Sequence, residues 1–288
     1  MKLMVAVLSL AVCASTAAAE EGPRLAAHGT IDTPLPVLMK QLEEGRSRQA
    51  ADFKPSPDVV LEGAEPAFIF SVVGTAGAFR TEGVLVNRRS QAQTIAAYYW
   101  PIGAGASNCN LTGRAYVMNA NTKYFFSDFV PDLFPGQSGF GSVIIIGVTS
   151  SGDADLNARI DGNARIWSLA TGGGTASQNF PSMSVQVPAG QQSAFGLRSD
   201  EVYRTNWGIF NYHTVTRTFD ILFDGLRGSS QISRDIPPCS LVQQLVPGGP
   251  YGSLEIVFAP RDGGGLYFAY GSSVDNTSLD AWSVPARK

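Results

Sequence analysis

The chain has 288 residues, of which 44% are hydrophobic and 16% are charged, and its formal net charge is −3. This slightly acidic balance excludes the basic surface that nucleic acids and acidic membranes select, so no nucleic-acid partner is predicted. The 31 glycines and 17 prolines favour many turns over long helices, and the length fits one large or two medium domains.

The first predicted element is a secretory signal peptide over residues 1–19. Lys2 precedes an apolar run, and small residues follow as far as Ala19. The apolar run is shorter than the roughly 20 residues that span a bilayer, so no stable membrane insertion is predicted. Cleavage between Ala19 and Glu20 is expected to release a secreted, periplasmic or cell-surface protein.

Residues 20–62 are predicted to form a leader or linker, since they lack the alternating pattern of strands. Within them, Val37, Leu38 and Leu42 form one face of a predicted short helix. Gly45 weakens this helix, and the prolines of the following KPSPD segment end it.

From about residue 63 the chain consists of short β-type runs separated by Gly, Asn and Pro. Residues 218–223 and 253–259 alternate apolar and polar side chains, and residues 142–148 (SVIIIGV) form an uninterrupted, β-branched apolar run. These patterns are typical of strands that are buried on one or both faces. Amphipathic helices do not alternate with the strands, which argues against a parallel α/β sheet.

A nine-residue phrase occurs twice, as FRTEGVLVN at 79–87 and as YRTNWGIFN at 203–211. Each copy is followed by a further strand and later by a Pro-Gly turn, at Pro135-Gly136 and Pro247-Gly248. We interpret this as duplication of one β-structural unit, and we expect the two phrases to superpose.

The predicted fold is therefore all-β, with two tandem immunoglobulin-like β-sandwich repeats over residues 63–181 and 182–288. Each repeat offers short strands and turns at the spacing expected of a β-sandwich. A single merged sandwich, or a barrel built from both halves, is the alternative.

The second copy resembles a tandem β-sandwich module of bacterial secreted proteins, in which R-T-N-x-G-L-x-N is followed by Pro-Gly and by V-D-N-x-T-x-D. Copy one departs from this wording at Glu82 and Gly83, and Ala281 stands where a proline follows the closing Asp. The resemblance covers about residues 63–288 and implies an exported, non-catalytic module without a cofactor. The residues that carry it are Arg80, Thr81, Asn87, Arg204, Thr205, Asn206, Gly208, Asn211, Asp275 and Asn276.

The sequence offers few residues for catalysis or metal binding. Its two histidines are His28 and His213, which leaves little for a metal centre or a histidine-dependent triad. Residues 152–164 space acidic side chains like a calcium loop, but Ala158 and Ala164 stand at the glycine and glutamate positions. No catalytic, cofactor-binding or metal residue is predicted, although a pair of carboxylates for glycoside hydrolysis stays open as an alternative.

Two cysteines, Cys109 and Cys239, remain after removal of the signal peptide. An oxidising compartment favours a disulfide between them over two buried free thiols. We place both in the same connection of their repeats, and repeats packed about a two-fold axis would bring equivalent loops together.

The predicted function is that of an exported surface, adhesion or binding module, whose partner is an unidentified extracellular protein or glycan. The alternative is a carbohydrate-binding or carbohydrate-active secreted protein, with the aromatics at 98–100, 124–126 and 267–270 as a sugar platform. Core packing is favoured for these aromatics, because every second side chain of a strand points inward.

Overall fold

The computed structural model describes residues 23–52, 64–103, 109–169, 175–185, 190–262 and 267–287. Most of the described residues lie in strands and few lie in helices, which confirms the predicted all-β class. The predicted signal peptide and its cleavage site lie outside the described residues. None of the helices that the described residues form is both long and apolar enough to cross a membrane.

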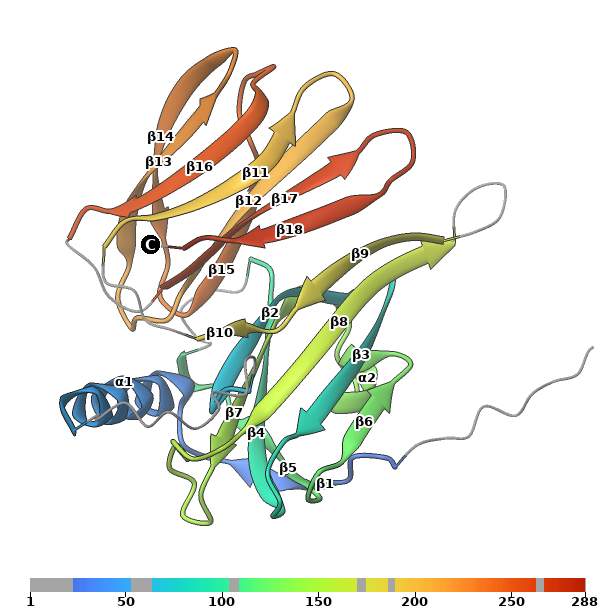
Figure 1. Ribbon diagram of the computed structural model, residues 1–288, viewed down its shortest axis with the longest axis vertical. Coiled ribbons are helices and arrows are strands. Elements are labelled where there is room, and N and C mark those ends of the chain that lie inside the picture. Colours follow the sequence, from blue (N-terminus) through green and yellow to red (C-terminus); the bar gives the residue numbers. More distant parts are fainter. Residues whose placement is uncertain are drawn as a thin grey trace, which may run out of the picture.

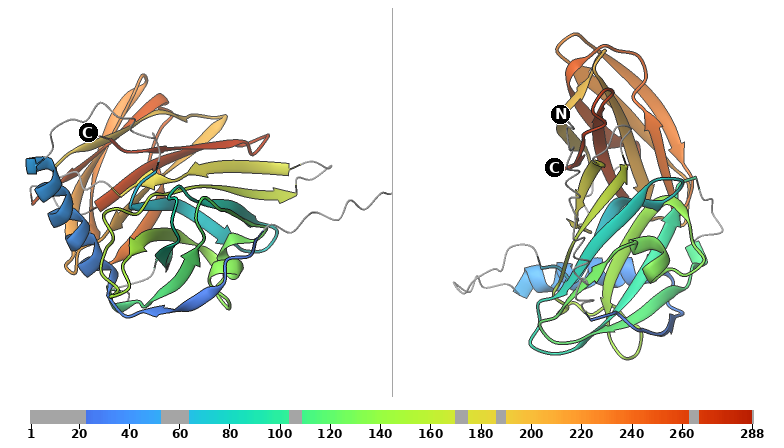
Figure 2. Two further views of the ribbon diagram at one scale, coloured as in Figure 1. Left: turned by 60° about the horizontal axis from the view of Figure 1, so that its bottom comes forward. Right: turned by 90° about the vertical axis from the view of Figure 1, so that its right-hand side faces the viewer.

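The chain has an N-terminal and a C-terminal half, stacked along the long axis of the molecule (Figures 1 and 2). The elements of the N-terminal half are β1 (Ala27–Ile31), α1 (Leu35–Asp52), β2 (Ala67–Thr75), β3 (Arg80–Asn87), β4 (Gln93–Pro101), β5 (Gly113–Met118), β6 (Lys123–Phe126), α2 (Phe129–Leu133), β7 (Gly139–Val148), β8 (Ile160–Leu169), β9 (Thr175–Pro181) and β10 (Met183–Ser184). Those of the C-terminal half are β11 (Gln192–Ser199), β12 (Tyr203–Asn211), β13 (Arg217–Gly225), β14 (Gly228–Ile236), β15 (Ser240–Leu245), β16 (Gly252–Pro260), β17 (Tyr267–Asp275) and β18 (Ala281–Pro285).

The strands form three sheets, and one of them crosses from one half to the other (Figure 1). The N-terminal sheet has the order β1-β5-β4-β7-β2-β10, and the C-terminal sheet has the order β11-β16-β13-β14. The shared sheet has the order β15-β12-β17-β18-β9-β8-β3-β6. Its halves meet where β18 pairs in parallel with β9, with Ala281 opposite Gln178 and Trp282 opposite Asn179.

The shared sheet packs against the other two sheets on opposite faces. In β8, Ala164 packs in a core with Phe68 of the N-terminal sheet. In β12, Trp207 and Ile209 pack in a core with Phe219 of the C-terminal sheet. Side chains alternate along each strand, so the face of the shared sheet that carries Ala164 can be followed through the pairing register from β8 across the β9–β18 junction, called the seam below, to β12. In β12 this face lies opposite to the face that carries Trp207 and Ile209. Each half is thus a sandwich, and the second is turned over relative to the first.

The N-terminal sheet is covered on both faces. Val143 and Ile145 of β7 pack in the core shared with β3, β8 and α2, whereas Ile144 and Ile146 pack in a second core with α1 and the C-terminal half. This explains the uninterrupted apolar run at 142–148, because alternation is lost when both faces of a strand are buried. The aromatics at 98–100 and 267–270 are likewise buried.

The predicted leader contributes two packed elements. Strand β1 pairs with β5, and α1 lies against the N-terminal sheet (Figure 2). The helix buries Leu38 and Leu42 as expected, but Val37 is 45% exposed. A Cβ atom at Gly45 would lie 2.2 Å from the Leu156 side chain, so glycine permits the helix to approach that loop.

The two halves have corresponding strand orders. The order β5-β4-β7-β2 corresponds to β14-β13-β16-β11, and the order β6-β3-β8-β9 corresponds to β15-β12-β17-β18. The two copies of the repeated phrase, β3 and β12, therefore occupy corresponding places in the shared sheet. Duplication of the unit stays a prediction, which superposition of the two phrases would test.

The asparagines that end the two phrases are buried and make corresponding hydrogen bonds. Each side-chain oxygen accepts from the backbone N–H two residues later, at Arg89 and His213. Each Nδ2 faces three backbone carbonyls, and the last two belong to the end of the following hairpin. The acceptors are Gln91, Met118 and Asn119 for Asn87, and Val215, Ile236 and Pro237 for Asn211.

The threonines of the phrase also bind the backbone of the preceding strand. The Thr81 hydroxyl donates to the carbonyl of Gly74 at 2.8 Å, and that of Thr205 donates to the carbonyl of Arg198, in both cases seven residues earlier. Thr and Asn of the signature thus hold neighbouring strands and turns together.

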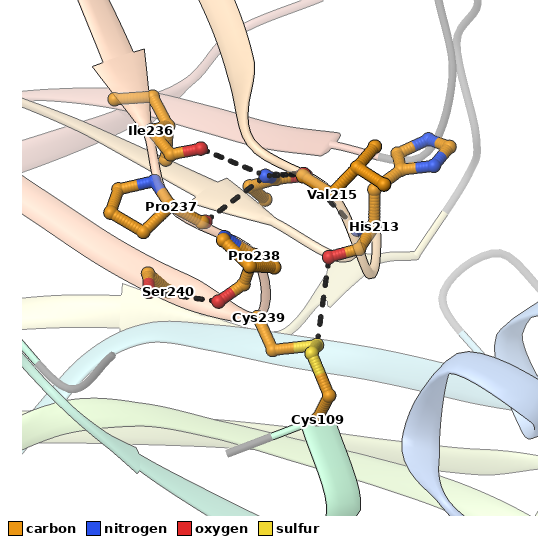
Figure 3. Close-up of a disulfide and its surroundings, with 9 residues drawn as sticks. Cys109, His213, Val215, Ile236, Pro237, Pro238, Cys239 and Ser240 are labelled. Atoms are coloured by element: carbon orange, nitrogen blue, oxygen red, sulfur yellow. Dashed lines mark hydrogen bonds between the residues drawn. A yellow bond between two sulfur atoms is a disulfide. The ribbon is translucent and has the colours of Figure 1, made fainter. Parts of the chain in front are cut away.

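The predicted disulfide between Cys109 and Cys239 is present, with a Cα–Cα distance of 5.2 Å, and it connects the two halves (Figure 3). The predicted placement of both cysteines in the same connection of their repeats is wrong. Cys109 lies between β4 and β5, whereas Cys239 lies between β14 and β15, which correspond to β5 and β6. The bridge therefore joins two different connections of the sandwich.

The residue that corresponds to Cys239 in the N-terminal half is Asn121. Both have the left-handed backbone that few residues other than glycine adopt, with φ of 46° at Cys239 and 50° at Asn121. Their N–H groups donate to the carbonyls of His213 at 3.0 Å and of Arg89 at 2.9 Å. A tight turn therefore presents the Cys239 sulfur to the other half.

His213, in the turn after β12, is expected to make stability depend on pH. Burial and the nearby Arg217 hold the pKa of His213 below its ordinary value, against the opposing charge of Asp262. The unfolded chain therefore binds a proton at His213 more readily than the folded chain does. The contribution of His213 to the free energy of unfolding is complete above about pH 6.5 and is lost as the pH falls toward the pKa of the folded state. The free energy of unfolding in urea should decrease from about pH 7.5 to about pH 5.5, and this decrease should be smaller for His213→Gln than for the original chain. An equal decrease in both would contradict this assignment.

Candidate binding site at the junction of the two halves

A cavity of about 300 Å³ lies where the shared sheet passes from one half to the other. Its floor is formed by residues of β8, β9, β12, β15, β17 and β18, all of the shared sheet. Its opposite wall is formed by β2, β7 and the ends of the strands next to them. Such volumes are typical of pockets that hold small molecules.

The floor carries polar side chains on a single face of the shared sheet. The pairing register places Asn206 opposite Ser272 and Arg204 opposite Val274, and it continues through Ala281 to Gln178 across the seam. The polar residues on this face are Ser168, Gln178, Arg204, Asn206, Gln243 and Ser272, and Ser177 of β9 also lines the cavity.

The wall is apolar. It consists of Val72, Phe79, Ile102 and Phe140, and the rings of Phe79 and Phe140 meet edge to face with centroids 5.7 Å apart. The cavity thus combines a polar surface and an apolar surface. An arrangement of this kind orients a ligand by hydrogen bonds on one side and by apolar contact on the other.

Several polar groups of the floor keep hydrogen-bonding capacity. Gln178 donates to Ser272 at 2.7 Å, and Gln243 accepts from the Tyr270 hydroxyl at 2.6 Å. Ser168 is 6% exposed, and its hydroxyl has no hydrogen-bond partner among the described residues. A hydroxyl that lines a cavity and has no partner among the described residues is available to a ligand.

The cavity opens to solvent beside Arg204, where Phe79 and Leu279 are also exposed. The Arg204 guanidinium donates to the Asn276 side-chain oxygen at 2.8 Å. Within the described part of the chain, Arg204 makes no salt bridge. A cation that has no carboxylate partner among the described residues therefore lies at the entrance.

The structure brings together part of the predicted signature. Arg204 and Asn206 line the cavity, and Asn276 holds Arg204. Asp275 accepts hydrogen bonds from the backbone N–H groups of Ser278 and Thr277, which hold its pKa below the ordinary value. The signature residues that lie away from the cavity are Arg80, Thr81, Asn87, Thr205, Gly208 and Asn211.

Three residues of the floor carry no sequence signal that would have identified them. Ser168, Gln178 and Gln243 come from different strands of the two halves. Ser168 and Gln178 lie on the paired strands β8 and β9, and the parallel pairing of β9 with β18 connects them to the half that contains Gln243. That pairing has no counterpart in the repeated pattern of the sequence.

Carboxylates are absent from the described lining of this cavity. Over the described ranges, no group of three or more His, Cys, Asp and Glu residues is arranged to hold a metal ion. Asp153 of the acidic loop accepts hydrogen bonds from Ser151 and Gln41, which lower its pKa and tie the loop to α1. The geometry of the cavity therefore favours binding through hydrogen bonds and apolar contacts.

Comparison with known proteins gives no family. No protein-family profile matches the chain, and no curated protein sequence matches it. Among solved structures, the apo form of Pleurotus ostreatus lectin is similar at 11% sequence identity, with 81% of this chain and 83% of that chain covered. The TM-score of that likeness is 0.17, below the range of a shared fold.

Proposed function

We propose that this protein is a non-catalytic binding protein and that its ligand occupies the cavity between the two halves. The observation that carries the proposal is the opposition of a polar floor to an apolar wall within one cavity of about 300 Å³. The ligand is a small molecule with a polar side and an apolar side.

We further propose that the protein acts outside the cytoplasm. The signal-peptide pattern at residues 1–19 supports export, and the Cys109–Cys239 bridge is typical of oxidising compartments. The place of action is then the periplasm, the cell surface or the medium, where an extracellular glycan or protein would supply the ligand.

The cavity is tested with the fluorescent probe 1-anilinonaphthalene-8-sulfonate, which has an apolar ring system and one anionic group. The folded chain beginning at Glu20 is expected to bind the probe saturably at one site. Ser168→Phe should weaken binding at least about tenfold, because the added ring occupies the space that the probe needs.

The matched control is Leu169→Phe. Leu169 is the next residue of β8, faces the other way and is 73% exposed, so its replacement should leave probe binding unchanged. Thermal unfolding of both variants separates loss of the cavity from loss of the fold. Absence of saturable binding, or equal binding by a folded Ser168→Phe variant, would refute the proposed site.

A further inference from the structure

We infer that the junction cavity selects ligands that carry a carboxylate on an apolar body, and that Arg204 binds the carboxylate. The inference rests on the proposed function, because it names the ligand class of the same cavity. It is carried by a difference between two corresponding arginines of the repeated phrase.

In the N-terminal half, the corresponding Arg80 is neutralised by protein groups. Its Nε lies 3.3 Å from the Asp128 carboxylate, and its Nη1 donates to the carbonyls of Gly77 and Phe79 at 2.8 and 2.7 Å. These contacts occupy the planar fork through which arginine binds carboxylates. Arg80 is thus satisfied by the protein, and it does not line the cavity.

In the C-terminal half, the carboxylate is replaced. Asp128 lies two residues beyond Phe126, and the pairing registers of β6 and β15 make Gln244 the counterpart of Phe126. The counterpart of Asp128 is therefore Val246, which is buried in the C-terminal core. The acid that would neutralise Arg204 is absent from this position.

Asn276 holds the guanidinium in place without neutralising it. It accepts one hydrogen bond from Arg204 at 2.8 Å, and an amide carries no charge. The other N–H groups of the fork remain available at the entrance of the cavity. Asn206 lies two residues along β12 on the same face, and its side chain has no hydrogen-bond partner among the described residues.

The remainder of the cavity selects the body of the ligand. The wall beside the entrance is formed by Phe79, Phe140 and Val72, and acidic residues are absent from the described lining. An apolar chain or ring against this wall places an attached carboxylate near Arg204 and Asn206. Two N–H donors of one guanidinium match the two oxygens of a carboxylate, which a neutral hydroxyl does not reproduce.

The test compares matched ligands by calorimetry on the folded chain beginning at Glu20. Sodium octanoate is expected to bind at least about tenfold more tightly than 1-octanol, because charge-assisted hydrogen bonds exceed neutral ones by about this factor. Sodium glucuronate, which has the carboxylate without the apolar body, is expected to bind more weakly than octanoate.

The decisive variant is Asn276→Asp, which places a carboxylate against Arg204 in a side chain of the same shape. It should weaken octanoate binding about tenfold or more and leave 1-octanol binding unchanged. Arg165→Gln, which removes an arginine that pairs with Glu82 on the other face of β8, is the control and should bind octanoate like the original chain.

Equal affinities for octanoate and 1-octanol, or no effect of Asn276→Asp on octanoate, would overturn the inference and leave the cavity as a binding site. Tighter binding of glucuronate than of octanoate would overturn the inference that the ligand needs an apolar body. Failure of octanoate, 1-octanol and the fluorescent probe alike would overturn the proposed function itself.

Discussion

Joint replacement of Cys109 and Cys239 by serine is expected to lower the free energy of unfolding by about 5 kcal/mol, as an upper value. The bridge closes a sequence separation of 130 residues, and constraining so long a loop removes much of the entropy of the unfolded chain. Urea unfolding of the oxidised chain and of the double serine variant, both beginning at Glu20, measures the difference.

Reducing agent supplies the control for this experiment. It should shift the unfolding midpoint of the original chain toward that of the double variant and leave the variant itself unchanged. Coincident midpoints of the oxidised chain and the double variant would show that the bridge does not contribute to stability.

Asn211→Ala is expected to lower the free energy of unfolding by about 3 kcal/mol. The substitution removes the Nδ2 donor from the carbonyls of Val215, Ile236 and Pro237, which lie 2.9 to 3.0 Å away, and leaves buried acceptors unpaired. Asn87→Ala removes the corresponding donor in the other half and should cost a similar amount.

Asn211→Asp distinguishes the donor from the acceptor of this side chain. The aspartate still accepts from the backbone N–H of His213, but it presents oxygen atoms to three carbonyls. It should therefore be at least as unstable as Asn211→Ala. A stability equal to that of the original chain, for either substitution in denaturant unfolding, would refute the role assigned to the amide.

The strands could be predicted because their side-chain periodicity depends on local burial. Residues 218–223 lie in β13, which has one face toward a core, and they alternate apolar and polar side chains as that burial requires. Residues 142–148 lie in β7, which is buried on both faces, and their uninterrupted apolar run is typical of such strands. Local pattern and tertiary burial agree in these strands.

The candidate site could not be predicted from the sequence, because its geometry depends on how the two halves pair. Arg204 and Asn206 belong to the repeated phrase, for which the sequence predicts a structural role and no binding role. Ser168 and Gln178 reach the same cavity through two residue pairs between β9 and β18, and one chain's sequence contains no pattern for such pairing. The predicted position of Cys239 is wrong for a related reason, because composition alone does not distinguish the connection after β14 from the connection after β13.

Pairing of β9 with β18 also protects the protein from association with other chains. A sandwich that ended at β9 or at β18 would present unpaired backbone N–H and C=O groups along an edge strand, which another chain could extend into a larger sheet. Here each of the two edges is covered by the other, through the pairs Ala281–Gln178 and Trp282–Asn179. The pairing of β9 with β18 that forms the junction cavity therefore also limits edge-to-edge aggregation. Because both halves belong to one chain, each of the two strands always has the other available as its partner.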